Sequence, residues 1–173
     1  QKGDKVIINT PAYAPLMRAI TDTGRIPVIN PLKYENGFYS MDMNALEEMV
    51  DDSVKMFILC SPHNPTGRVW TRDEILEIVD FCYSHNIILF SDEIHSDMVY
   101  KSNMHTPIVK MPQKYLDNVI LANSITKTFN VPGLIISSLI IPNEDIRKKV
   151  EDMIDRAGMR NPNIYALAAM EAA

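Results

Sequence analysis

The sequence predicts an α/β protein of three layers, in which an open, mostly parallel β-sheet carries helices on both faces. Several short segments are continuously apolar, which is typical of strands buried on both faces of a parallel sheet. Segments with apolar residues at helical spacing separate them. Polar residues follow three of the apolar segments directly, and open parallel sheets bind ligands beyond the carboxyl ends of their strands.

The first third of the chain supplies two strands, a helix between them and a second helix. The strand, helix and strand are expected over Lys5–Asn9, Pro11–Thr23 and Ile26–Ile29. Gly24 ends the first helix. A turn at Asn36-Gly37 leads to Asp42, a residue type that caps helices, so we expect a helix from there to about Asp51.

The rest of the chain supplies the most apolar strands. Three buried strands are expected over Lys55–Cys60, Asn86–Ser91 and Val119–Ala122. Thr71 and Glu74 have the spacing of a capping box and predict a helix that runs to about His85. The run Leu134–Ile141 predicts one or two further strands, and an amphipathic helix follows over about Asn143–Arg160.

The composition excludes several classes of protein. The 173 residues are 46% hydrophobic and 23% charged, which suits one domain or one large piece of a larger domain. No apolar run reaches the roughly 18 residues of a membrane helix, and residues 1–30 lack a signal peptide, so we expect a cytoplasmic protein. A net charge of -5 without a basic cluster argues against nucleic acid as a partner. Cys60 and Cys82 show no CxxC spacing and are expected to be buried.

Three polar clusters follow the three buried strands of the middle region. They are His63-Asn64, Asp92-Glu93-Ile94-His95 and Ser124 to Lys127. Because parallel strands end at the same edge of a sheet, we expect these clusters to share one pocket.

Lys127 has unusual company for a lysine. A lysine flanked by apolar strands can lose solvation, which makes its amine easier to deprotonate and able to attack a carbonyl. Ser124 and Thr126 stand three residues and one residue before it and suit a phosphate group, although helix capping is an equally ordinary role for either. Pyridoxal phosphate needs an amine, phosphate donors and a carboxylate to protonate its ring nitrogen. The ordinary alternative for Lys127 is a surface lysine.

The motifs NPTG at 64–67, SDEIH at 91–95 and SxTK at 124–127 resemble, in that order, the fold type I pyridoxal-phosphate-dependent aminotransferases (class I/II). The segments CSPHNPTGRVWT, SDEIHSDMVY and KTFNVPGL resemble most the cystathionine β-lyase-like branch of C–S β-lyases. The resemblance covers essentially the whole chain. It implies that residues 1–173 are the central part of the cofactor-binding large domain, with an N-terminal segment and a C-terminal small domain absent.

The resemblance also implies roles for individual residues. Lys127 would form the Schiff base and move the substrate's α-proton, and Asp92 would pair with the pyridinium nitrogen. Asn64 would donate to the phenolic oxygen of the cofactor, His95 stands where many aminotransferases have a tyrosine, and Tyr13 would stack on the ring. Their ordinary alternatives are a helix cap for the aspartate, a turn residue for the asparagine, a structural histidine and a core tyrosine.

Ser124 and Thr126 would bind the phosphate in this family. The branch usually has serine where this chain has Thr126, and the hydroxyl is kept. Many aminotransferases have an arginine eight residues after the lysine, where this chain has Ile135. Neutralisation of the phosphate would therefore depend on other groups.

The resemblance favours a C–S β-lyase that acts on amino acids and pairs as a homodimer. An aminotransferase of the same superfamily would use Lys127, Asp92 and Asn64 in the same way and remains the alternative. Two readings belong to other classes: a non-catalytic fragment or interaction module, and a metal-dependent hydrolase. The ligands of such a metal would come from Asp92, Glu93, His95 and Asp97, with His63 or His105.

Overall fold

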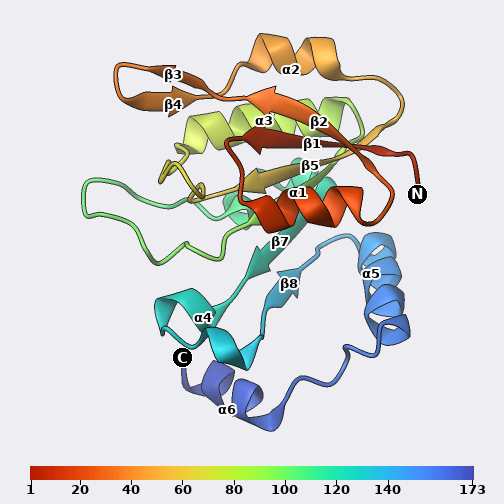
Figure 1. Cartoon of the computed structure of the whole chain (residues 1–173), viewed down its shortest axis with the longest axis vertical. Coiled ribbons are helices and arrows are strands. Elements are labelled where there is room, and N and C mark those ends of the chain that lie inside the picture. Colours follow the sequence, from red (N-terminus) through yellow and green to blue (C-terminus); the bar gives the residue numbers. More distant parts are fainter.

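A computed structural model describes all residues from 1 to 173 and contains a six-stranded sheet in the order β2-β1-β5-β6-β7-β8 (Figure 1). The strands are β1 (Lys5–Thr10), β2 (Ile26–Pro31), β5 (Val54–Cys60), β6 (Ile88–Asp92), β7 (Val119–Asn123) and β8 (Ser138–Ile140). All neighbours pair in parallel except β7 and β8, which are antiparallel. A separate hairpin joins β3 (Lys33–Glu35) to β4 (Phe38–Ser40).

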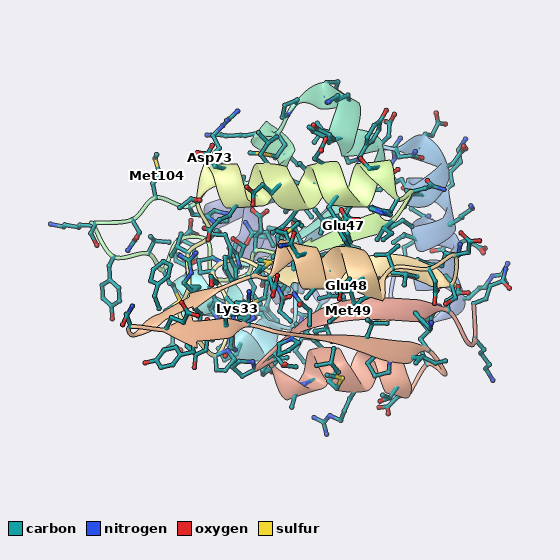
Figure 2. All side chains as sticks on the ribbon, turned by 90° about the horizontal axis from the view of Figure 1, so that it is seen from above. Lys33, Glu47, Glu48, Met49, Asp73 and Met104 are labelled. Carbon is teal, nitrogen blue, oxygen red and sulfur yellow. The ribbon has the colours of Figure 1, made fainter.

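Helices cover both faces of this sheet, as the sequence predicts. The helices of the chain are α1 (Ala14–Thr21), α2 (Met43–Met49), α3 (Arg72–Ser84), α4 (Ile125–Thr128), α5 (Glu144–Arg156) and α6 (Ile164–Ala172), with short 3-10 turns η1 (Ile108–Lys110), η2 (Gln113–Asn118) and η3 (Pro132–Leu134). Of these, α1 packs on one face of the sheet, and α2 and α3 pack on the other. Figure 2 shows α2 and α3 side by side, with Glu47 and Glu48 on α2 and Asp73 on α3. No helix is both long enough and apolar enough to cross a membrane.

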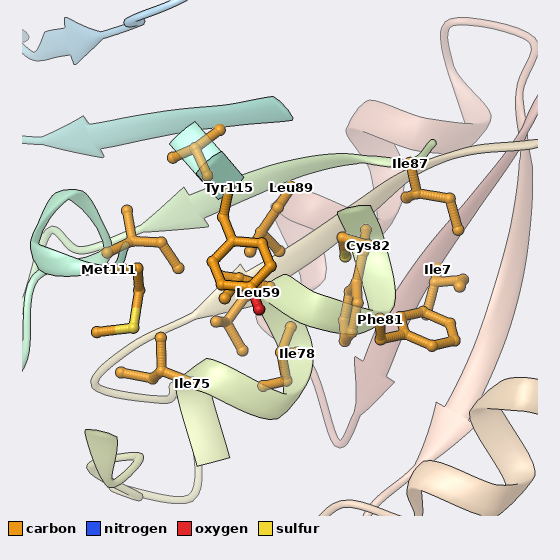
Figure 3. Packing of buried hydrophobic residues seen from close by; sticks show 14 of the residues in the cluster. Ile7, Leu59, Ile75, Ile78, Phe81, Cys82, Ile87, Leu89, Met111 and Tyr115 are labelled. Carbon is orange, nitrogen blue, oxygen red and sulfur yellow. The ribbon is translucent and has the colours of Figure 1, made fainter. Parts of the chain in front are cut away.

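The two faces of the sheet are packed to different extents. A cluster of 20 buried residues joins the strands to α2, α3 and the turns η1 and η2, and Figure 3 shows part of it around Leu59 and Ile78. A cluster of only 4 buried residues joins the other face to Ile20 of α1. Successive residues of β5 alternate between the clusters, because side chains of a strand point to opposite faces: Phe57 belongs to the first and Ile58 to the second.

The capping signals of the sequence are present in the structure. The Asp42 carboxylate accepts a hydrogen bond from Ala45 N at 3.2 Å and begins α2. Thr71 and Glu74 form the predicted capping box at the start of α3, with Glu74 N donating to Thr71 Oγ1 at 3.2 Å and Thr71 N donating to Glu74 Oε2 at 2.7 Å. These local bonds fix where the chain turns from loop to helix.

The structure differs from the sequence-based expectation in the last third of the chain. The run Leu134–Ile141 supplies one strand, within the expected one or two, but the strand has only three residues, because η3 occupies the start of the run and Ile135 adopts a left-handed conformation with φ +48°. The helix expected over Asn143–Arg160 ends at Arg156, and a further helix, α6, follows. Figure 1 shows α5 and α6 at the β8 end of the molecule, apart from α1, α2 and α3.

Candidate functional site

A cavity of about 410 Å³ lies at the carboxyl ends of the central strands. All seven side chains singled out in the sequence line it: Tyr13, Asn64, Asp92, His95, Ser124, Thr126 and Lys127. The three polar clusters of the sequence therefore meet in one pocket, although each follows a different strand.

The register of the sheet explains this convergence. Cys60 at the end of β5 pairs with Asp92 at the end of β6, and Asp92 pairs with Ala122 of β7. Neighbouring strands are about 4.8 Å apart, so the segments that follow these three positions begin side by side. Asn64 follows the first of them and Ser124 follows the third.

Asp92 occupies the middle of this row. Its Oδ1 accepts a hydrogen bond from Ile94 N at 3.3 Å, and its Oδ2 has no partner within the protein. Burial raises the pKa of Asp92 above its usual value, while Ile94 N and His95 act in the opposite direction. An acid with one free oxygen in a partly desolvated pocket is suited to pair with a cationic group of a ligand.

His95 stands beside Asp92 and Lys127 and is only partly buried. Burial lowers the pKa of His95, the Asp92 carboxylate opposes this change, and the Lys127 ammonium adds to it. The imidazole makes no side-chain hydrogen bond within the protein and is available to a ligand in its neutral form.

Lys127 lies on the four-residue helix α4, and its side chain is exposed. The loss of solvation expected from the flanking apolar strands is therefore not seen, because the lysine stands on α4, beyond the end of β7. The next residue anchors the helix: Thr128 Oγ1 donates to Asp97 Oδ2 at 2.8 Å. The amine can reach the cavity while its helix is tied to the segment after His95.

Asn64 belongs to a loop that other side chains hold in place. Its backbone N donates to Cys60 Sγ at 3.4 Å, and its side-chain amide has no partner within the protein. The preceding His63 is buried, shares a hydrogen bond of 2.8 Å between its Nδ1 and Thr66 Oγ1, and lies edge-on to Trp70. Burial lowers the pKa of His63 to about 4, so its ring is neutral and packs as part of the loop.

Ser124 and Thr126 hydrogen-bond to the protein itself in this structure. Ser124 Oγ donates to the carbonyl oxygen of Ile136 at 2.5 Å and accepts from Thr126 N at 3.1 Å as the cap of α4. With its proton committed, Ser124 Oγ accepts from Thr126 Oγ1 at 2.8 Å. Both hydroxyl protons are used internally, so the capping role stated as an alternative for Ser124 is present.

Tyr13 precedes α1 as its N-cap and makes no capping bond with its side chain. Tyr13 is 48% exposed and lines the cavity, so the alternative of a core tyrosine is wrong. In the order of the strands, Tyr13 follows β1, Asp92 ends β6, and the hydroxyl residues and Lys127 follow β7, so the acid stands between the aromatic ring and the hydroxyl groups.

Sequence reasoning did not assign a role to seven further lining residues, most of which are apolar. The further residues are Cys60, Ile94, Pro132, Ile135, Ile136, Ser137 and Met159. Cys60 was expected to be buried, and it is, but it also lines the pocket, and burial raises the pKa of its thiol to about 11. Its position at the last residue of β5 was the signal available in the sequence.

The lining fits pyridoxal phosphate by the chemistry of its groups. A free carboxylate oxygen, an exposed amine, an unpaired amide and an aromatic ring share one cavity. The metal alternative lacks a ligand set, since no three His, Cys, Asp or Glu side chains stand close enough together to hold an ion.

Comparisons with known proteins find lyases and aminotransferases that are similar to this chain. Cystathionine beta-lyase PatB of Bacillus subtilis is 37% identical over 174 residues, which cover 100% of this chain and 45% of PatB. Protein MalY of Escherichia coli is 35% identical over 175 residues, which cover 100% of this chain and 44% of MalY. An aspartate aminotransferase of Sulfolobus acidocaldarius is 32% identical over 152 residues, or 87% of this chain and 37% of that protein.

Solved structures share the fold closely. A pyridoxal-phosphate-bound putative aminotransferase from Clostridium difficile has a TM-score of 0.96 at 40% identity, covering 99% of this chain and 44% of its own. Cystalysin from Treponema denticola, which contains pyridoxal 5'-phosphate, has a TM-score of 0.95 at 35% identity, covering 98% and 43%. This chain therefore spans less than half the length of these relatives.

The family model described as aminotransferase class I and II matches residues 1–173. Because the match extends over the whole chain, this protein belongs to the class I and II aminotransferase family.

Proposed function

We propose that this chain is the cofactor-facing part of a pyridoxal-phosphate-dependent C–S β-lyase that acts on amino acids. The observation that carries the proposal is the placement of Lys127, Asp92 and Asn64 around one cavity. The names of the relatives favour the lyase, since PatB is a cystathionine beta-lyase. The match covers only 45% of the length of PatB, which supports the further proposal that residues 1–173 are the central part of a larger cofactor-binding domain.

Bound pyridoxal phosphate supplies an aldehyde that bonds to amines and a protonated ring that withdraws electrons from the substrate's α-carbon. The free Oδ2 of Asp92 would hold the proton on the ring nitrogen. Lys127 Nζ would hold the aldehyde carbon and, once free, would take the proton from the α-carbon of the amino acid. Asp92 is partly buried and Lys127 is exposed, which suits a fixed ion pair and a moving base, respectively.

Three other side chains would orient the ring. The unpaired amide of Asn64 would donate to the phenolic oxygen, and the neutral imidazole of His95 would lie beside the same oxygen. The exposed Tyr13 ring would cover one face of the cofactor and exclude water from it. None of these roles needs a bond within the protein to break, because the Asn64 amide and the His95 ring have no partners there.

Binding of phosphate by Ser124 and Thr126 would need a rearrangement. The Thr126 hydroxyl would turn from Ser124 Oγ toward the ligand, while Ser124 could keep its bond to the Ile136 carbonyl. Ile135 supplies no charge at the cavity wall. A cation from outside these residues would therefore be needed to balance the phosphate.

The expected reaction converts an amino acid bearing sulfur on its β-carbon, together with water, to a thiol, pyruvate and ammonia. Transamination is the second candidate, favoured by the likeness to the Sulfolobus acidocaldarius aspartate aminotransferase, and it uses the same three residues. Both reactions begin with loss of the α-proton. In β-elimination the sulfur substituent then leaves the β-carbon, whereas in transamination the proton is returned to the cofactor and the β-substituent stays in place.

One experiment separates these functions. The complete polypeptide that carries these residues is incubated with pyridoxal phosphate and L-cystathionine, and pyruvate is measured with lactate dehydrogenase. A lyase gives pyruvate without a 2-oxo acid as co-substrate, whereas an aminotransferase turns over only when one is added. A non-catalytic module gives neither product and binds no cofactor, and that result would end the proposal.

The proposal extends to a cytoplasmic homodimer. Size-exclusion chromatography coupled to light scattering tests the oligomeric state of the complete polypeptide directly. A monomer at micromolar concentration would contradict it.

A further inference from the structure

Glu93 is a buried acid to which the proposed chemistry assigns no role. Its exposed fraction is 2%, and it does not line the cavity, although its neighbours Asp92 and Ile94 do. Burying a carboxylate is costly unless hydrogen bonds replace the water that it loses. The contacts that do so indicate what this side chain holds together.

Three donors meet the two oxygens of Glu93. Oε1 accepts from Ser91 Oγ and from Ile108 N, both at 2.9 Å. Oε2 accepts from His105 Nε2 at 2.8 Å. The backbone N of Glu93 also donates to the carbonyl oxygen of Ala122 at 2.8 Å, which extends the pairing of β6 and β7 by one residue.

Two of these donors, His105 and Ile108, lie near the far end of a long loop and directly after it, respectively. Residues 94–107 leave β6 directly after Glu93, contain no helix or strand, and return to it at His105 and Ile108. The outer part of the loop is exposed, and Figure 2 shows Met104 on this projecting loop. The inner part carries His95, so one carboxylate ties together the two ends of the segment that bears a cavity residue.

We propose that Glu93 is a positioning residue that closes the base of the loop 94–107 and thereby holds Asp92 and His95 in the cavity. The inference rests on the proposed function, because it concerns the residues that would face the cofactor. An ionised carboxylate suits this role, since both of its oxygens accept hydrogen bonds. A glutamine could still accept from Ser91 and Ile108, but its NH₂ group would face the Nε2 of His105.

The test compares Glu93→Ala and Glu93→Gln in the complete polypeptide by two measurements. Hydrogen exchange of residues 94–107 is followed without cofactor, and the dissociation constant of pyridoxal phosphate is measured by absorbance. Glu93→Ala is expected to speed exchange and to weaken cofactor binding about tenfold each, as the loss of charge-assisted hydrogen bonds predicts. Glu93→Gln is expected to recover part of both losses, because two of the three donors keep their acceptor.

Matched variants separate positioning from general destabilisation. Ser91→Ala removes the donor that lies on β6 and leaves both loop contacts in place, so exchange in 94–107 and cofactor affinity should stay within about twofold of the wild type. Ile78→Ala lowers the melting temperature through a void in the core, at a residue of α3 that neither contacts Glu93 by a hydrogen bond nor lines the cofactor cavity, and should leave the affinity unchanged. His105→Phe breaks one loop contact and should raise exchange less than Glu93→Ala does.

The proposal is wrong if Glu93→Ala weakens cofactor binding no more than Ile78→Ala, or if exchange in 94–107 does not change. If Glu93→Ala fails to fold, the comparison of His105→Phe with Ser91→Ala decides, and equal exchange in both would overturn it. The exchange measurement needs no cofactor. A wild type that binds no pyridoxal phosphate would therefore end the proposed function while the loop contact is still judged on its own.

Discussion

Asp92 and Lys127 face the same cavity, but the protein holds them very differently. Asp92 ends a central strand whose backbone pairs on both sides, with Cys60 and with Ala122, and buried Glu93 anchors the next position. Lys127 is exposed on a helix of four residues that stands beyond the sheet. The difference teaches that the sheet fixes the acid, whereas the amine stands on a short, exposed helix. In the proposed function, Asp92 would be the fixed partner of the cofactor ring, and Lys127 would be a movable base that acts at two places.

The largest effect is expected from removal of the amine of Lys127. Lys127→Ala should abolish trapping of pyridoxal phosphate by borohydride and lower turnover by ~10³-fold or more, because no other amine lines the cavity. Peptide mapping after reduction identifies the labelled residue. Lys148→Ala on α5, an exposed lysine paired with Glu144, is the matched control and should behave as the wild type. Cofactor trapped at full yield in Lys127→Ala would break the comparison.

Removing the fixed acid is expected to have the next largest effect. Asp92→Ala should leave the circular dichroism spectrum and the sheet intact and lower turnover by about 100-fold or more, because the electrostatic partner of the ring is lost. Steady-state kinetics with saturating cofactor measures the change. Turnover within a factor of about three of the wild type would contradict the role of this acid.

A substitution at Asn64 tests whether the loop after β5 holds the cofactor together with Asp92. Asn64→Ala removes an amide that has no partner in the protein, so its loss should not destabilise the fold. Cofactor affinity should fall about tenfold, the value of one good hydrogen bond to a ligand. Equilibrium titration by absorbance gives the affinity, and an unchanged value would remove Asn64 from the site.

A smaller effect is expected from loss of the hydrogen bond that joins α4 to the loop after β6. Asp97→Ala removes the bond between the loop after His95 and Thr128 on α4. The bond is exposed, so turnover should fall only about threefold, consistent with ~0.5–1 kcal/mol. A double-mutant cycle with Thr128→Val checks that the two changes are not additive. Additive losses would show that this hydrogen bond does not couple the helix of Lys127 to the segment that follows Asp92 and His95.

The pH dependence of stability sharpens the comparison further. Because burial raises the pKa of Asp92 in the folded protein, its ionised form destabilises the cofactor-free protein at neutral pH. That cost is absent below the unfolded pKa of about 3.9 and grows as the pH rises through the folded value. Asp92→Asn should therefore melt higher than the wild type at neutral pH, with a difference that vanishes near pH 4. Calorimetry without cofactor measures it, and an unfavourable shift at pH 7 would contradict the assignment.

Sequence reasoning predicted most of the fold because the central strands are continuously apolar and the helix starts carry clear caps. Lys55–Cys60, Thr71 with Glu74, and Asp42 all have their expected roles. The last third was harder. The Asn163 side chain accepts a hydrogen bond from Ala166 N and begins α6, so the sequence contains a cap for a helix that the pattern of apolar residues does not predict.

The polar lining of the cavity could be expected because it follows strand ends, whereas its apolar lining could not. Met159 and Ile136 reach the pocket only through the path of the chain after β7, which no local pattern encodes. The exposure of Lys127 was likewise hidden, since flanking apolar residues say nothing about how far a helix stands from the sheet. The spacing of residues also does not predict that the Ser124 hydroxyl donates its hydrogen bond to the Ile136 carbonyl oxygen.

Ile135 gives the cavity wall an unusual property. A β-branched residue rarely adopts a φ of +48°, and glycine would adopt it without steric conflict. The chain thus tolerates a strained corner in order to set a bulky aliphatic group at the rim. Ile135→Gly would relax that corner, so robustness to heat and selectivity among ligands are expected to move in opposite directions at this one position.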